Sequence, residues 1–111
     1  MKSPLHILHL EDNTNDATLV QSRLETEGIT PLITRVQTRE EFIAALEHGD
    51  FDLVLSDFSL PAFDGMAAIK IVRARQPNLP VILVSGSLGE ERAIDSLKSG
   101  ATDYVLKERL G

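Results

Sequence analysis

The feature that most constrains the fold of this chain is a regular alternation of short apolar runs with longer amphipathic segments. The apolar runs predict five strands, at residues 5–10, 30–36, 51–57, 80–86 and 102–107. The segments between them predict four helices, at 16–27, between Thr38 and Gly49, at 65–76 and at 90–100. No internal repeat or linker-like run interrupts this pattern, so we expect residues 1–111 to form a single domain.

Local signals mark where several of these helices begin and end. Thr38 and Glu41 have the spacing of a capping box, which predicts that the second helix starts at Thr38. Gly28 and Gly100 follow the first and fourth helices, as glycines that terminate helices in a left-handed conformation do. Pro77 closes the third helix, because proline removes a backbone donor that a continuing helix needs.

Strands separated by helices of about ten residues are joined by right-handed crossovers. The pattern therefore predicts a doubly wound α/β domain, with a parallel sheet and helices on both faces. In such folds ligands bind beyond the carboxyl ends of the strands. The residues at those ends are Glu11, Asp12, Asp57, Ser85 and Lys107. We expect these five side chains to lie near one another at one edge of the sheet.

The chemistry of these residues favours a metal ion and a phosphoryl group. Adjacent carboxylates such as Glu11 and Asp12 repel by ~4 kcal/mol at an effective dielectric of about 20, so they are solvated, protonated or bound to a cation. With Asp57 they form an oxygen-ligand set suited to Mg2+. Lys107 is a compact charge that suits an oxygen anion, and Ser85 a hydroxyl donor to it. Asp57 is then a candidate nucleophile that forms an aspartyl phosphate.

Charge and composition argue against some partners and indicate the compartment of the protein. Eleven Lys and Arg against seventeen Asp and Glu give a net charge of −6, which argues against direct binding to nucleic acid or to an anionic membrane. The absence of cysteine fits a reducing compartment and points to the cytoplasm. The sequence contains no signal peptide and no apolar run long enough to span a bilayer, so we expect a protein without membrane insertion.

Over nearly its whole length the chain resembles the receiver domain of two-component response regulators. The resemblance lies in an ordered set of motifs: Glu11-Asp12 after the first predicted strand, Asp57 in LSDFSLPAFDG, Ser85 in VILVSG, and Tyr104 with Lys107 in DYVLK. It implies the flavodoxin-like fold with sheet order 2-1-3-4-5. The segments DFSLP and SGSLGEE are most similar to receivers joined to sensor or hybrid kinases.

The resemblance also implies a role for each site residue. Asp57 is the implied phosphoacceptor, modified by a histidine kinase or a histidine phosphotransfer protein. The implied metal ligands for Mg2+ are Glu11, Asp12, Asp57 and the backbone carbonyl of Ser59. Ser85 is the hydroxyl that turns toward the phosphate and Lys107 the lysine that binds it, while Tyr104 is the aromatic residue that changes rotamer on switching. The implied function is a phosphorylation-dependent conformational switch, not an enzyme, that signals to an output domain or effector protein.

The chain departs from the family pattern at three places. Glu108 follows Lys107 where the family has a proline with a cis peptide bond, and Gly86 follows Ser85 where alanine is common. The chain ends at Gly111, where receivers begin a fifth helix. We therefore expect the fifth helix to be missing or truncated and the chain to be a piece of a larger protein.

Other interpretations of the same residues remain open. Ser85 and Lys107 also fit a loop cap and a surface lysine, and Tyr104 fits simple packing. A small phosphatase with Asp57 as nucleophile would need a second acid at the position that Ser59 occupies. A nucleotide- or flavin-binding module would need a glycine-rich loop in place of EDNTND. The last alternative is a pseudo-receiver that binds a partner without being phosphorylated.

Overall fold

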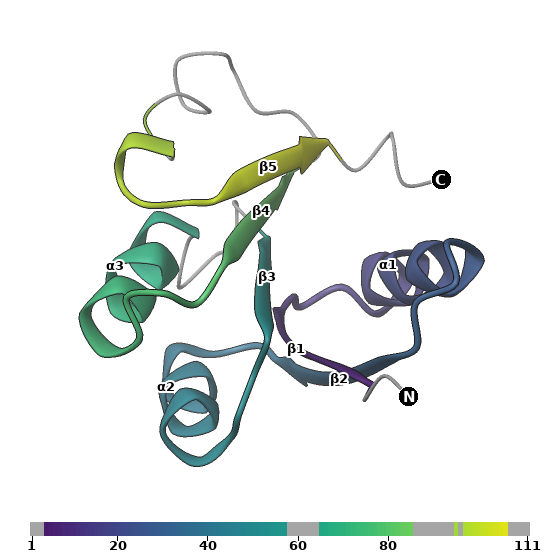
Figure 1. Cartoon of the computed structure of the whole chain (residues 1–111), viewed down its shortest axis with the longest axis horizontal. Helices are drawn as coiled ribbons and strands as arrows, with labels where there is room; N and C mark the ends of the chain where they lie inside the picture. The colour runs from purple at the N-terminus through teal and green to yellow at the C-terminus, as the bar shows by residue number, and fades with distance from the viewer. Residues whose placement is uncertain (1–3, 58–64, 86–94, 96, 107–111) are drawn as a thin grey trace.

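The computed structural model describes residues 4–57, 65–85, 95 and 97–106. Within them, five strands alternate with three helices (Figure 1). In chain order the elements are β1 (Leu5–Leu10), α1 (Thr14–Thr26), β2 (Pro31–Val36), α2 (Arg39–His48), β3 (Leu53–Asp57), α3 (Gly65–Arg75), β4 (Val81–Ser85) and β5 (Asp103–Leu106). Among the described residues, every helix is too short or too polar to cross a bilayer.

All five strands are parallel and lie in one sheet, in the order β2-β1-β3-β4-β5. Both the predicted doubly wound architecture and the order 2-1-3-4-5 are therefore confirmed. Each observed strand begins and ends within two residues of its predicted bounds. The largest difference is at the start of β3, where Asp52 lies before the strand and its backbone amide donates to the carbonyl of His6.

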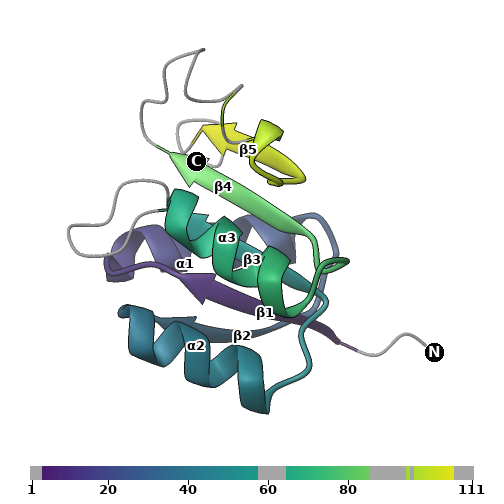
Figure 2. The same cartoon turned by 90° about the vertical axis from the view of Figure 1, so that its left-hand side faces the viewer.

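Helices cover both faces of the sheet, as Figures 1 and 2 show. Helices α2 and α3 pack on one face, where the main core includes Phe42 and Leu46 of α2 and Ile69 and Val72 of α3. Helix α1 packs on the other face over a smaller cluster, through Val20. The strands supply the remaining core residues, which the alternation of side chains divides between the two faces.

The two helix starts that the structure describes fully are both capped by side chains. The Thr38 hydroxyl accepts from the Glu41 amide at 3.1 Å, and the Glu41 carboxylate accepts from the Thr38 amide at 3.2 Å, which confirms the capping box. The prediction for α1 was less accurate, because the helix begins at Thr14 and not at Asp16. Asn13 is its N-cap, and the Asn13 side chain accepts from the Asp16 amide at 3.0 Å.

Both glycines that were predicted to terminate helices have positive φ. Gly28 follows α1 with φ 84°, and Gly100 has φ 116°. Of the predicted helix at 90–100, only residues 95 and 97–100 are described, and Asp95, Leu97 and Lys98 among them are helical. The predictions for the end of the chain, including the fifth helix and the geometry at Glu108, lie outside the described residues, as does Gly86.

Candidate functional site

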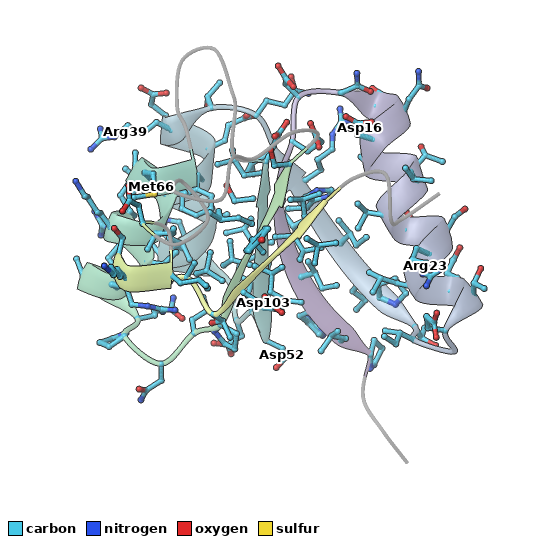
Figure 3. All side chains as sticks on the ribbon, turned by 90° about the horizontal axis from the view of Figure 1, so that it is seen from above. Asp16, Arg23, Arg39, Asp52, Met66 and Asp103 are labelled. Atoms are coloured by element: carbon cyan, nitrogen blue, oxygen red, sulfur yellow. The ribbon has the colours of Figure 1, made fainter. Side chains whose placement is uncertain are left out.

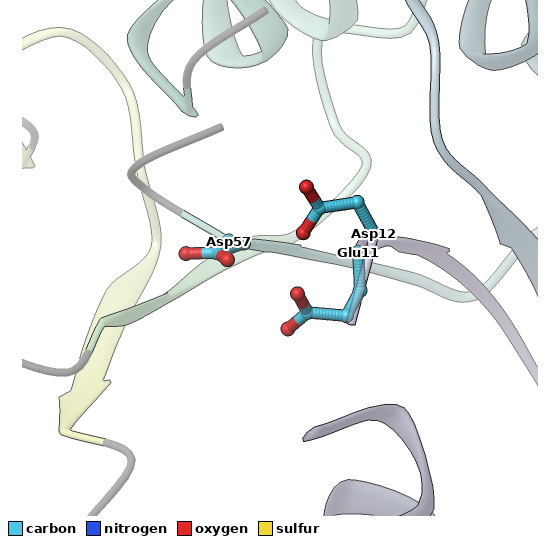
Figure 4. A group of neighbouring side chains, drawn as sticks. All are labelled: Glu11, Asp12 and Asp57. Carbon is cyan, nitrogen blue, oxygen red and sulfur yellow. The ribbon is translucent and has the colours of Figure 1, made fainter. Parts of the chain in front are cut away.

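Three carboxylates meet at the carboxyl end of the sheet. Glu11 follows β1 directly, Asp12 is the next residue, and Asp57 is the last residue of β3 (Figure 4). One carboxylate oxygen from each of the three lies within 4.8 Å of the other two. Glu11 is fully buried and Asp57 is 6% exposed, while Asp12 is exposed to solvent. The expected convergence of these three acids is therefore present in the structure.

The turn after β1 holds the first of these acids in place. The backbone amide of Glu11 donates to the carbonyl of Val36 at 3.0 Å, which continues the pairing of β1 with β2 past the end of β1. The backbone amide of Asn13 donates to Oε2 of Glu11 at 3.3 Å. Asn13 also caps α1, so one residue contacts both the start of the helix and a buried carboxylate.

Asn13 was missed when the sequence alone was considered. Its signal is present in the sequence, because an asparagine three residues before an acidic residue is a common start of a helix. The structure shows that the helix begins two residues earlier than the apolar pattern indicated. The polar turn EDNTND thus contains two acids of the site, Glu11 and Asp12, and the residue that caps α1.

Ser85 is the last residue of β4, the strand that pairs with β3 and therefore lies beside Asp57. In the register of β3 and β4, Asp57 is paired with Val84, so Ser85 lies one residue further toward the carboxyl edge. Its side chain is 3% exposed. This places Ser85 at the edge where the acids meet, as predicted, whereas its proposed contact with a phosphoryl group stays a prediction.

Two other predicted site residues, Ser59 and Lys107, lie outside the described residues. Lys107 directly follows Leu106, and Leu106 is paired with Ser85 in the register of β4 and β5. The predicted roles of Lys107 in phosphate binding and of the Ser59 carbonyl in metal binding stay predictions that rest on the family resemblance.

Tyr104 lies in the middle of β5. It is half-buried and packs against the main core cluster, on the face that α2 and α3 cover. This packing is what the simpler interpretation of Tyr104 requires, and the proposed change of rotamer remains a prediction.

The donor set of this site suits a hard divalent cation. Three carboxylates whose oxygens lie within 4.8 Å of one another repel strongly, by ~4 kcal/mol per pair at an effective dielectric of about 20, and a cation removes this repulsion. All three ligand atoms are oxygens, which Mg2+ and Mn2+ prefer. Among the described residues, no other group of three or more acidic, histidine or cysteine side chains is close enough to hold a metal ion.

Residues 7–109 match the response regulator receiver domain family. A relative, the transcriptional regulatory protein ZraR of Salmonella typhimurium, is 28% identical over 107 residues, which are 96% of this chain and 24% of that protein. The chain thus spans about a quarter of the length of the curated relatives that it matches first.

Solved receiver structures superpose closely on this chain. A CheY-like receiver domain protein from Methanospirillum hungatei JF-1 has a TM-score of 0.80 and 30% identity, over 95% of this chain and 82% of that one. The Mn2+-bound form of response regulator Rcp1 has a TM-score of 0.79 and 25% identity, over 93% of this chain and 81% of that one. With the family match and the acidic cluster, these likenesses show that the chain belongs to the response regulator receiver domain family of two-component systems.

Proposed function

We propose that this domain is a phosphorylation-dependent switch in a two-component phosphorelay and that Asp57 is its phosphoacceptor. The observation that carries the proposal is the position of Asp57 at the end of β3, with Glu11 and Asp12 within ligand distance. A carboxylate at the end of a buried central strand is held rigidly, because β3 is paired on both sides, with β1 and β4. A rigid nucleophile costs little conformational entropy to position for attack.

In the proposed transfer, an oxygen of the Asp57 carboxylate attacks the phosphorus of a phosphohistidine. The bond between phosphorus and the histidine nitrogen breaks, and the nitrogen keeps the electron pair. The product is an acyl phosphate on Asp57 and a free histidine on the donor. The donor is a histidine kinase or a histidine phosphotransfer protein, and the recipient of the signal is an output domain or effector protein.

We further propose Mg2+ as the metal of this site. Asp12, Glu11 and Asp57 would hold the ion, which supplies positive charge to the phosphoryl oxygens during transfer. The Mn2+-bound form of the structurally similar Rcp1 supports a divalent cation at a receiver of this fold. The family resemblance adds the Ser59 carbonyl as a ligand and Lys107 as a cation for the phosphate.

The addition of a phosphoryl group explains how such a site could signal without turnover of a substrate. Phosphorylation adds a charge of about −1.5 to −2 and three acceptor oxygens. Asp57 is paired with Val84 in the sheet, and Ser85 is the residue after Val84. The Ser85 hydroxyl is therefore on the strand next to the phosphorylated residue, one position further toward the carboxyl edge. We propose that the attraction of Ser85 toward the phosphate starts the conformational change, and that the domain is a switch, not an enzyme.

Incubation with acetyl phosphate and Mg2+, followed by intact-protein mass spectrometry, tests the proposal. We expect the mass to increase by one phosphoryl group, and the label to be released by hydroxylamine, as an acyl phosphate is. Asp57→Asn should abolish the increase. The matched control is Asp50→Asn, which changes an exposed acid before β3 and should leave labelling intact. Full labelling of the Asp57→Asn variant, or no labelling of the native protein, would rule out Asp57 as the acceptor.

A further inference from the structure

The last turn of α3 carries an arginine that binds two separate segments of the chain. Nε of Arg73 donates to the carbonyl of Gly100 at 2.8 Å. Its Nη1 donates to the carbonyl of Leu79 at 2.6 Å and to that of Pro77 at 3.3 Å. We call these three hydrogen bonds the Arg73 clamp. A guanidinium group suits this role because its donors have a fixed planar geometry and it stays charged at every accessible pH.

Gly100, which accepts one of the hydrogen bonds of the clamp, has a backbone conformation that favours glycine. Gly100 has φ 116°, a conformation that other residues rarely adopt. A Cβ atom at Gly100 would lie 3.0 Å from Cγ of Arg73, so a larger residue would also force the Arg73 side chain to shift. The clamp therefore depends on both partners, a long side chain at Arg73 and the absence of one at Gly100.

A second pair of hydrogen bonds fixes the same segment to β4. The amide of Thr102 donates to the carbonyl of Val81 at 2.7 Å. The amide of Val81 donates back to the Thr102 hydroxyl at 3.1 Å. The residues 100–102, which lead into β5, are thus tied to α3 by Arg73 and to β4 by Thr102.

These contacts lie at the end of the sheet opposite the acids. In Figure 3, Asp52 and Asp103, which lie at the amino ends of β3 and β5, appear at one end of the sheet, and Asp16 near the start of α1 appears at the other. Strand β5 runs from the clamped end toward the acids, and its last residue, Leu106, pairs with Ser85. β5 is at the edge of the sheet, so within the described residues β4 is its only strand neighbour.

We propose that the Arg73 clamp makes residues 100–102 a fixed pivot for β5, so that charging of the acid site displaces the Ser85 end of β4 and β5 and leaves the clamped end in place. This proposal rests on the proposed function, because the displacement is the response to phosphorylation. New charge on Asp57 acts first on the strand next to it, at Ser85. A strand that is held at one end responds to this force at its other end, which turns a local attraction into a directed movement of β5.

The test is the amide NMR spectrum of the whole chain with and without beryllium fluoride and Mg2+, a stable mimic of a phosphoryl group on a carboxylate. In the native protein we expect larger shift changes at Ser85 and Leu106 than at Gly100 and Thr102. This comparison needs no variant, and equal changes at both ends would overturn the pivot. Because Ser85 and Leu106 also lie nearer the acids, the role of the clamp itself is tested by the arginine variants.

Two arginine variants distinguish the loss of the clamp hydrogen bonds from the loss of one positive charge on α3. Arg73→Met removes the clamp, whereas Arg75→Met removes an exposed arginine of the same helix whose partner is Glu47 of α2, at 2.9 Å. With Arg73→Met, we expect the Gly100 and Thr102 amides to exchange hydrogen roughly tenfold faster, and the shift changes on adding beryllium fluoride to spread to them. Arg75→Met should behave as the native protein does. Gly100→Ala should reproduce the effect of Arg73→Met from the other partner.

The experiments distinguish a failure of the pivot alone from a failure of the proposed function. Equal shift changes at Thr102 and Ser85 in the native protein would overturn the pivot and leave the proposed function standing. Indistinguishable behaviour of the Arg73→Met and Arg75→Met variants would also overturn the pivot. The absence of any shift change on adding beryllium fluoride and Mg2+ would overturn the proposed function and, with it, the pivot.

Discussion

The backbone amide of Asn13 donates a hydrogen bond to the carboxylate of Glu11 at 3.3 Å, while the side chain of the same asparagine caps α1. One residue therefore contacts both the start of the helix and a buried acid. These two contacts are separable by mutation, because the bond to Glu11 uses the main chain and the cap uses the side chain.

Asn13→Ala should lower the free energy of unfolding by about 1 kcal/mol, since the cap of α1 is lost. The amide that binds Glu11 remains, so Mg2+ affinity should change much less than the stability does. Urea unfolding monitored by circular dichroism gives the first quantity and calorimetric titration with Mg2+ the second. Asn13→Ser, which keeps a capping oxygen, is the control and should retain most of the stability. A native-like unfolding midpoint for Asn13→Ala would show that the cap contributes nothing.

Asp12→Ala should weaken Mg2+ binding most among single substitutions of exposed acids. Asp12 is the exposed member of the carboxylate cluster, and its removal leaves Glu11 and Asp57 as carboxylate ligands. We expect the dissociation constant to rise by roughly tenfold or more, which corresponds to about 1.4 kcal/mol. Titration calorimetry measures it, with Glu40→Ala on the exposed surface of α2 as a control for net charge. Equal affinities of the two variants would mean that Asp12 is not a ligand.

The acid cluster was predictable because it follows from strand ends. Once β1 and β3 are recognised as parallel strands, Glu11 and Asp57 must lie at the same edge of the sheet, whatever the details of packing. The order of the strands was not predictable from periodicity, since an apolar run encodes burial and not the identity of its neighbour. That order came from the family resemblance, and the structure confirms it.

The contacts that sequence analysis missed are those whose partners are backbone atoms. Arg73 binds three carbonyl groups, and a carbonyl is present at every residue, so no pair of side chains signals the interaction. Asn13 was missed for a related reason. Several residues of the turn EDNTND are suitable caps, and only the backbone conformation determines which of them serves.

The stability of α2 should depend on pH through Glu41. Hydrogen bonds from the backbone amides of Gln37 and Thr38 lower the pKa of this carboxyl below its ordinary value of 4.5. Because the pKa in the folded state is the lower one, the contribution of Glu41 is complete above pH 4.5 and is lost as the pH falls through the folded-state value. Acid therefore destabilises the start of α2.

Glu41→Gln isolates this contribution. The difference in unfolding free energy between the native protein and the variant should shrink between about pH 7 and about pH 3, because glutamine cannot titrate. Chemical denaturation at a series of pH values measures the difference. Glu47→Gln, which changes an exposed glutamate near the other end of α2, is the matched control for charge. A difference that is constant over this pH range would contradict the role assigned to the Glu41 carboxylate.

Gly28→Ala should destabilise the domain through the backbone alone. Gly28 has φ 84° after α1, and no atom beyond Gly28 and its two chain neighbours lies within 4 Å of the position that a Cβ would occupy. The left-handed conformation costs a residue with a Cβ roughly 1–2 kcal/mol, while alanine also restricts the unfolded chain and thereby offsets part of that cost. We expect a net loss of about 1 kcal/mol in urea unfolding. Gly28→Asn should lose less, because asparagine tolerates this conformation at helix ends. Equal stability of the alanine and asparagine variants would show that backbone strain does not govern this position.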